Sequence, residues 1–312
     1  MKIALHSVSL SGFFYKGEAV PLKELIPLVK DFGYDGLELM AKRPHANPMD
    51  LSNKVRKEIR EQADSYSIEL PILAAYPDFS GPDMFRRELN LLYMKEVIKL
   101  ATDLDIDKIR IFAAGMKSVS AEIPYEKQWK LCRDAIKEVA KWAEEYGVTL
   151  ALQNHPPVIE SYKDVMAMIE EVGIESLKAC IDPELLVWTG DIRLQEGDLE
   201  AKLREIYNEV KDYLVHIHIG DSIFRPGTLV WVPGTLSMLR SLRLERAKLG
   251  EGVFRVLGKP FIKTLKTIGY SSYISYEMCA PRYIKHELVT KEEVMKEAKS
   301  GAEYLRKLIS ES

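Results

Sequence analysis

Four side chains at the predicted carboxyl ends of consecutive strands have the chemistry of ligands for one divalent metal ion. They are Gln153, Asp182, His218 and Glu277. A set of two carboxylates, an amide and an imidazole suits Mn²⁺, Mg²⁺, Co²⁺ or Fe²⁺ better than a structural zinc site. The sequence contains no C-x-x-C, H-E-x-x-H or P-loop motif. We therefore expect a single divalent cation, with Mn²⁺ as the first choice.

Each of these residues also has an ordinary structural interpretation. A single carboxylate at a strand end is usually a loop cap or a salt-bridge partner, and a single histidine is usually a hydrogen-bonded core residue. The alternation of side chains along a strand does not show whether His216 or His218 is the ligand, because residues two apart on a strand point to the same side. Four such groups on successive strands favour the metal site.

The strands that position these groups are predicted from short apolar runs that recur along the chain. The runs are Lys2–Ser7, Gly36–Met40, Ile68–Ala74, Lys108–Ala113, Val148–Asn154, Lys178–Asp182, Leu214–Ile219 and Tyr273–Glu277. Amphipathic segments with an apolar spacing near 3.6 separate them, and 127–146 is a clear example. The strand ends fall about 39 residues apart, which is typical of a βα unit.

Eight alternating units predict an α/β fold, a single-domain (β/α)₈ TIM barrel over residues 1–312. A doubly wound open sheet is the alternative, but its usual G-x-G-x-x-G turn is missing after the first predicted strand. In a barrel, all strand carboxyl ends meet at one rim, which is where catalytic groups of this fold lie.

A long segment at about 222–250 interrupts the repeat after the seventh predicted strand. It carries Pro-Gly pairs at 226–227 and 233–234, together with Trp231, several leucines and several arginines. Exposed apolar residues in such number would form a large patch. We expect this insertion to cover the active site as a lid or to pack on another subunit, which would make the protein a homo-oligomer. An insertion that packs on its own barrel without a function is the third possibility.

Composition narrows the functional classes. The chain of 312 residues has a formal net charge of −3, which argues against a nucleic-acid partner. No apolar run reaches the length of a membrane span, and His6 falls too early for a signal peptide. Three widely spaced cysteines do not form a disulfide framework. These features predict a cytoplasmic protein with neither a nucleic-acid nor a membrane partner.

Further polar and aromatic residues near the predicted strand ends are candidates for substrate binding. They are His6, Glu38, Tyr76, Arg110, His216, Arg225 and Trp188. Arg110 and Arg225 are possible contacts for an anion, although neither belongs to a recognisable phosphate motif. Cys180 and Cys279 flank two predicted metal ligands, and we interpret them as core residues.

The chain resembles the xylose-isomerase-like barrel superfamily, which includes ketose 3-epimerases, inosose and 3-dehydroshikimate dehydratases and endonuclease IV. The motifs that carry the resemblance are Phe32–Leu39, Leu152–His155, Cys180–Asp182, Val215–His218, Leu249–Gly252, Ile268–Tyr270 and Ser275–Glu277. The resemblance implies metal ligands at Asp182, His218 and Glu277. At position 153 the family usually has glutamate, and this chain has Gln153.

This departure changes the expected chemistry. In ketose epimerases the two glutamates also form the acid/base pair, whereas an amide exchanges no proton near neutral pH. The chain also lacks the histidine that follows the strand-six aspartate in those enzymes. We expect Glu277 to act as the base, with Gln153 completing the site. His155 points to the same side as Gln153 and, by the resemblance, meets the substrate. A histidine that only caps the loop is the alternative.

The resemblance implies a metal-dependent isomerase or epimerase of a sugar or sugar phosphate. It would abstract the proton next to a carbonyl and form a metal-stabilised enediolate. A lyase that dehydrates an inosose or 3-dehydroshikimate, or that cleaves a 3-keto-glycoside, remains the alternative. A barrel that binds sugar without turnover is the non-enzymatic alternative. Endonuclease activity is disfavoured by the charge and by the small number of ligands.

Overall fold

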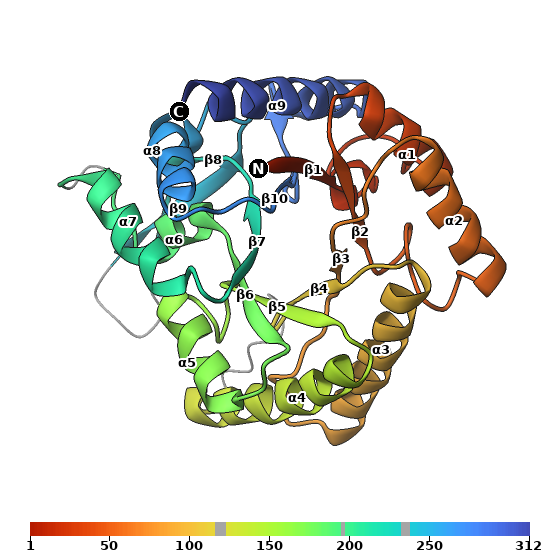
Figure 1. Ribbon diagram of the computed structural model, residues 1–312. Coiled ribbons are helices and arrows are strands. Elements are labelled where there is room, and N and C mark those ends of the chain that lie inside the picture. The colour runs from red at the N-terminus through yellow and green to blue at the C-terminus, as the bar shows by residue number, and fades with distance from the viewer. Residues whose placement is uncertain (116–122, 195–196, 232–237) are drawn as a thin grey trace.

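Eight parallel strands close into a barrel, which confirms the predicted (β/α)₈ fold (Figure 1). The strands are β1 (Lys2–His6), β2 (Gly36–Met40), β3 (Leu73–Ala74), β4 (Lys108–Ile111), β5 (Thr149–Gln153), β6 (Leu177–Ile181), β7 (Leu214–Ile219) and β10 (Tyr273–Tyr276). They pair around the barrel in the order β1-β10-β7-β6-β5-β4-β3-β2. The computed structural model describes residues 1–115, 123–194, 197–231 and 238–312, and only the backbone of 224–231 and 238–244.

Strand β3 is shorter than the segment predicted at 68–74. The chain pairs briefly at Glu69 with Gly36 and re-enters the sheet only at Leu73. Pro71 lies between these two points and has no backbone N–H to donate to the ladder, so the regular strand begins after it.

Helices surround the barrel in the described part of the chain, as Figure 1 shows. They are α1 (Leu22–Asp31), α2 (Asn53–Ser65), α3 (Met84–Asp103), α4 (Tyr125–Glu145), α5 (Tyr162–Val172), α7 (Leu199–Val210), α8 (Phe254–Thr267) and α9 (Lys291–Glu311). Shorter elements are η1 (Ser7–Leu10), α6 (Pro183–Thr189), β11 (Tyr283–Ile284) and β12 (Glu287–Leu288). Among the described residues, no helix is both long and apolar enough to cross a membrane.

The strands alternate between two buried environments. Leu5, Leu37 and Ile109 belong to the main hydrophobic core, which also includes residues of the surrounding helices. The residues between them in sequence include His6, Glu38 and Arg110, which are buried as well. Parallel strands normally carry apolar residues on both faces, so this alternation marks a polar barrel interior.

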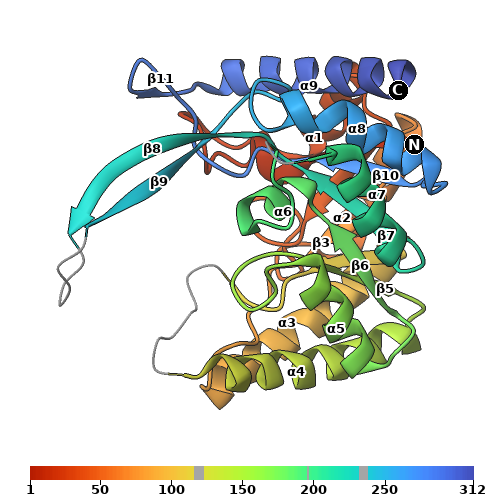
Figure 2. The same cartoon turned by 90° about the vertical axis from the view of Figure 1, so that its left-hand side faces the viewer.

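The insertion forms a β-hairpin. Strand β8 (Ser222–Trp231) pairs antiparallel with β9 (Met238–Arg246), and Figure 2 shows the pair standing out from the barrel. Residues 232–237 and the side chains of Arg225 and Trp231 lie outside the description. The proposed lid and subunit contact therefore stay predictions.

A buried carboxylate closes the base of the hairpin. The oxygens of Asp221 accept hydrogen bonds from the backbone N–H groups of Gly250, Gly252 and Phe254, at 2.8, 3.0 and 2.9 Å. A Cβ at Gly252 would lie 2.3 Å from the carbonyl oxygen of Ser222, so only glycine fits there. This explains the local Leu249–Gly252 motif as a packing requirement.

We predict that Asp221→Ala lowers the free energy of unfolding by about 2–4 kcal/mol, because buried backbone N–H groups lose the carboxylate that accepts their hydrogen bonds. Urea denaturation followed by circular dichroism measures the loss. The control is Asp198→Ala, which removes the cap of α7 and leaves one N–H, that of Ala201, without its acceptor. The control should cost about 1 kcal/mol. Equal losses in the two variants would contradict the assignment.

Candidate functional site

The polar residues of the barrel interior gather at the carboxyl ends of the strands. Those with side chains buried to 2 % exposure or less are His6, Glu38, Arg110, Gln153, Asp182, His216 and His218. Glu277 directly follows β10, and its side chain is 14 % exposed. The barrel mouth therefore holds many charged or titratable groups with little solvent around them.

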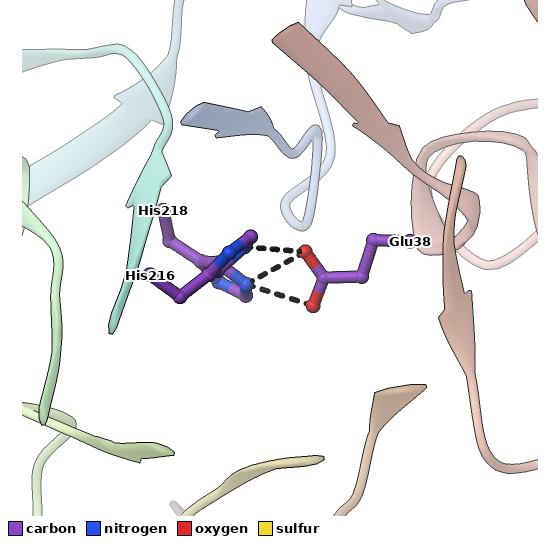
Figure 3. A group of neighbouring side chains, drawn as sticks. All are labelled: Glu38, His216 and His218. Atoms are coloured by element: carbon purple, nitrogen blue, oxygen red, sulfur yellow. Dashed lines mark hydrogen bonds and ion pairs between the residues drawn. The ribbon is translucent and has the colours of Figure 1, made fainter. Parts of the chain in front are cut away.

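Glu38 contacts two histidines from the far side of the barrel (Figure 3). The Nε2 atom of His218 lies 2.8 and 2.9 Å from the two Glu38 oxygens, and Nε2 of His216 lies 3.2 Å from Oε2. Strand β2 does not neighbour β7, so these contacts run through the barrel interior. The three side chains offer ligand atoms within 4.8 Å of one another and could hold a metal ion.

His218 also faces a second glutamate. Its Nδ1 atom lies 3.6 Å from Oε2 of Glu277 and has no hydrogen-bond partner in the described part of the chain. Burial would lower the pKa of His218, but Glu38 and Glu277 together raise this pKa to about 9. Burial would raise the pKa of Glu277, but His218 and then His6 lower it to about 2. Glu277 is therefore an ionised carboxylate at neutral pH.

Gln153 and Asp182 lie on the neighbouring strand ends. Gln153 is 1 % exposed, and neither atom of its amide has a hydrogen-bond partner among the described residues. A buried amide without partners is costly, so this side chain is suited to a ligand. Oδ1 of Asp182 caps α6 by accepting from the N–H groups of Glu184 and Leu185. Burial and the nearby Glu277 raise the pKa of Asp182 to about 7.

The residue types at Gln153, Asp182, His218 and Glu277 are those of divalent-cation ligands, but Asp182 and Glu277 do not belong to the described group whose ligand atoms lie within 4.8 Å of one another. A cation would relieve the repulsion between Asp182 and Glu277 and would satisfy the amide oxygen of Gln153 and Nδ1 of His218. Glu38 then holds the other nitrogen of His218, which is the usual arrangement around a metal-binding imidazole. Glu38 and His216 are predicted substrate contacts, and their side chains are hydrogen-bonded to one another. Their contact with substrate stays a prediction.

Asn154 positions Asp182, a role that the sequence analysis did not assign. Its side-chain oxygen accepts from the backbone N–H of Asp182 at 2.8 Å, and its side-chain nitrogen donates to the carbonyl oxygen at 3.1 Å. This double contact fixes the end of β6 against the end of β5. Its only sequence signal is that Asn154 directly follows a predicted ligand.

The other flank of the mouth is a stack of aromatic and cationic groups. The guanidinium carbon of Arg110 lies 4.0 Å from the ring centre of Phe112 and 4.8 Å from that of Tyr76. The ring of His155 packs on Phe112 at 4.0 Å. Tyr76 also reaches Nε2 of His6 at 3.2 Å. Phe112 was not predicted, although alternation places it on the same side as Arg110.

His155 is neutral in this stack. Burial, followed by the charge of Arg110, lowers the pKa of His155 to about 4. Its Nδ1 atom has no hydrogen-bond partner in the described chain. The ring is thus held by packing and keeps one nitrogen available.

Lys42 joins the same flank and was also missed by the sequence analysis. Its ammonium nitrogen lies 3.6 Å from the ring centre of Tyr76. Burial, and then the charge of Arg110, lowers the pKa of Lys42 to about 8. Lys42 lies two residues beyond β2, where the strand pattern has ended, so alternation alone gave no reason to select it.

Four further residues were singled out from the sequence, and their outcomes differ from one another. The indole N–H of Trp188 donates to the Ser222 hydroxyl at 3.2 Å, which ties α6 to the start of β8. Arg225 has no described side chain. Cys279 is exposed and not in the core, because it follows β10 in the loop, and its sulfur lies 3.5 Å from Oε1 of Glu277. Cys180 is buried, as expected.

The chain belongs to the xylose isomerase-like TIM barrel family, whose model matches residues 26–308. It is 26 % identical over 226 residues to the fructoselysine 3-epimerase of Shigella flexneri, covering 68 % of this chain and 76 % of that protein. It is 22 % identical to the L-ribulose 3-epimerase of Mesorhizobium japonicum, covering 71 % and 70 %. The solved D-psicose 3-epimerase of Clostridium cellulolyticum H10 superposes with a TM-score of 0.70 at 18 % identity, covering 99 % of each chain.

The two possible ligand groups share His218 and predict different effects of substitution. If Gln153, Asp182, His218 and Glu277 hold the cation, Asp182→Asn should reduce Mn²⁺ affinity at least about a hundredfold. His216→Gln should then reduce it about tenfold or less, because His216 would not touch the cation and would only support Glu38 and His218. Calorimetric titration of both variants with MnCl₂ measures these affinities. The reverse order would assign the cation to Glu38, His216 and His218.

Proposed function

We propose that the protein is a divalent-metal-dependent epimerase or isomerase that acts at the carbon next to the carbonyl of a sugar. The observation that carries this proposal is the position of the Glu277 carboxylate at the barrel mouth, 14 % exposed and with its Oε2 atom 3.6 Å from Nδ1 of His218. Family membership and the sugar 3-epimerases among the relatives support the same reaction class.

We assign Gln153, Asp182, Nδ1 of His218 and Glu277 as the metal ligands, with Mn²⁺ preferred and Mg²⁺, Co²⁺ or Fe²⁺ as substitutes. A bound divalent cation would supply Lewis acidity toward two adjacent substrate oxygens. Glu38 orients His218 by accepting from Nε2–H and leaves Nδ1 facing the site, where a bound cation would replace the proton that the raised pKa of His218 keeps on the ring.

Glu277 removes the proton next to the carbonyl, and the electron pair moves to the carbonyl oxygen. Gln153 cannot return a proton near neutral pH. In an isomerisation, Glu277 itself returns the proton to the adjacent carbon on the same face, and the hydroxyl proton of the carbon that becomes the new carbonyl passes to the former carbonyl oxygen. In an epimerisation, a second group must deliver it from the opposite face, and His155 with its unpartnered Nδ1 is our candidate.

A lyase is the second candidate, and Gln153 is the residue that favours it. With a single carboxylate base, removal of the proton can be followed by loss of a hydroxyl group from the next carbon. This β-elimination needs one base and one proton for the leaving group. The same proton abstraction precedes both outcomes, so one first experiment tests both.

We predict that the Mn²⁺-loaded protein exchanges the hydrogen next to the carbonyl of ketoses, inososes or 3-keto-glycosides in D₂O. Glu277→Gln should reduce this exchange by about a hundredfold or more, because it removes the base. Proton NMR measures the rate. Glu175→Gln, before β6 at the opposite end of the barrel, is the matched control and should leave the rate unchanged. Exchange that persists in Glu277→Gln would exclude Glu277 as the base.

Gln153→Glu should raise Mn²⁺ affinity by about one order of magnitude. The present ligand set carries two negative charges, which a divalent cation neutralises, and glutamate would add a third. One added charge close to the cation is a substantial contribution even at an effective dielectric constant of 20. Calorimetry of the two proteins side by side gives the ratio, and an unchanged or lower affinity would contradict the assignment of Gln153 as a ligand.

A further inference from the structure

Lys42 is a half-buried cation that packs on aromatic rings and, in the described part of the chain, forms no ion pair, although the charge of Glu277 acts on it. Its ammonium nitrogen lies 3.6 Å from the ring centre of Tyr76 and 5.6 Å from that of Phe13. Within the described chain it has no ion pair and no hydrogen bond to a protein group. The two rings stabilise the ammonium group by cation–π attraction but leave its three N–H donors without an acceptor.

A second cation, Arg110, acts on Lys42 as well: after burial, Arg110 is the main cause that lowers the pKa of Lys42, and Glu277 opposes it. Arg110 packs against Tyr76 as well, is 1 % exposed, and its Nε–H has no acceptor in the described residues. Its Nη1 donates to the carbonyl oxygen of Ala75 at 3.0 Å. The two cations share one aromatic ring and repel each other in a weakly screened environment. Glu38 and Glu277 attract Arg110, but within the described chain neither forms an ion pair with it or with Lys42. A group with negative charge is what this arrangement can stabilise.

The place of these cations relative to the catalytic groups is set by the barrel. In the strand order, β2 lies directly across from β6. Lys42 follows β2, and Asp182 follows β6. Arg110 comes from β4 and reaches the same ring of Tyr76. A sugar whose oxygens are held at the proposed ligands on β5 to β10 would therefore direct its other end toward the flank that contains Lys42.

We propose that Lys42 and Arg110 form a subsite for an anionic substituent on the distal end of the substrate, either a phosphate or a carboxylate. Lys42 makes the direct contact, and Tyr76 and Phe13 orient its ammonium group. Arg110 supplies a fixed positive charge behind Tyr76. This inference deepens the proposed function, because it assigns the substrate class of the same site.

The test compares three ketoses that differ only at carbon 6. D-fructose is neutral, D-fructose 6-phosphate carries a phosphate, and D-fructuronate carries a carboxylate. Dissociation constants are measured by calorimetry with the Mn²⁺-loaded protein, and exchange at carbon 3 is followed by NMR in D₂O. At least one anionic ketose should bind about tenfold or more tightly than D-fructose. The anionic ketose with the larger gain in affinity over D-fructose identifies the preferred anion as phosphate or carboxylate.

Lys42→Met removes the charge and keeps the length of the side chain, and Lys42→Arg keeps the charge. Lys42→Met should weaken the binding of the preferred anionic ketose about 10- to 100-fold and leave the affinity for D-fructose unchanged. Lys42→Arg should restore most of that loss. Lys95→Met is the matched control, because it removes a lysine that lies 4.1 Å from the ring centre of Trp142 on the outer helices.

Three outcomes would overturn the inference. They are equal affinity of the wild-type protein for all three ketoses, an equal loss for all three in Lys42→Met, and no measurable binding of either anionic ketose. The proposed function is tested by a separate measurement, the hydrogen exchange. Anionic ketoses that bind through Lys42 but exchange no hydrogen would support the subsite and contradict the reaction.

Discussion

The candidate site depends on the position of the His218 ring between two glutamates. One ring nitrogen meets Glu38 at 2.8 and 2.9 Å, and the other faces Glu277 at 3.6 Å. Because Glu38 comes from β2 and Glu277 follows β10, the imidazole links strands that do not neighbour each other. Its orientation is therefore fixed by contacts across the barrel interior, as metal-binding or proton-transferring groups require.

This dependence explains what the sequence could predict. Periodicity located the strands, and the rule that barrel strands end at one rim brought His6, Asp182 and Glu277 to the same place. The same rule placed Glu38 at the rim, as a candidate substrate contact. It could not predict that Glu38 contacts His218, because the two are 180 residues apart and their meeting depends on the closed barrel.

The residues that the sequence analysis missed belong to a different physical class. Lys42 and Phe112 act through packing against rings from other strands, and neither lies in a motif. Asn154 acts through the backbone of another strand, which leaves no sequence pattern either. Chemistry-bearing residue types are visible in a sequence, whereas the side chains that position them become visible only through their contacts.

The register of the barrel makes room for the cationic flank. In the sheet, Arg110 pairs with Ala74 on one side and Ala151 on the other. Small neighbours at the same level allow the long arginine side chain to lie inside a barrel that otherwise fills its interior in tight layers. The guanidinium then stacks between Tyr76 and Phe112, and on its far side Phe112 supports His155. The small size of these two alanines thus leaves room for the aromatic and cationic flank on β2–β4. This flank faces the ligand-type side chains on β5–β10.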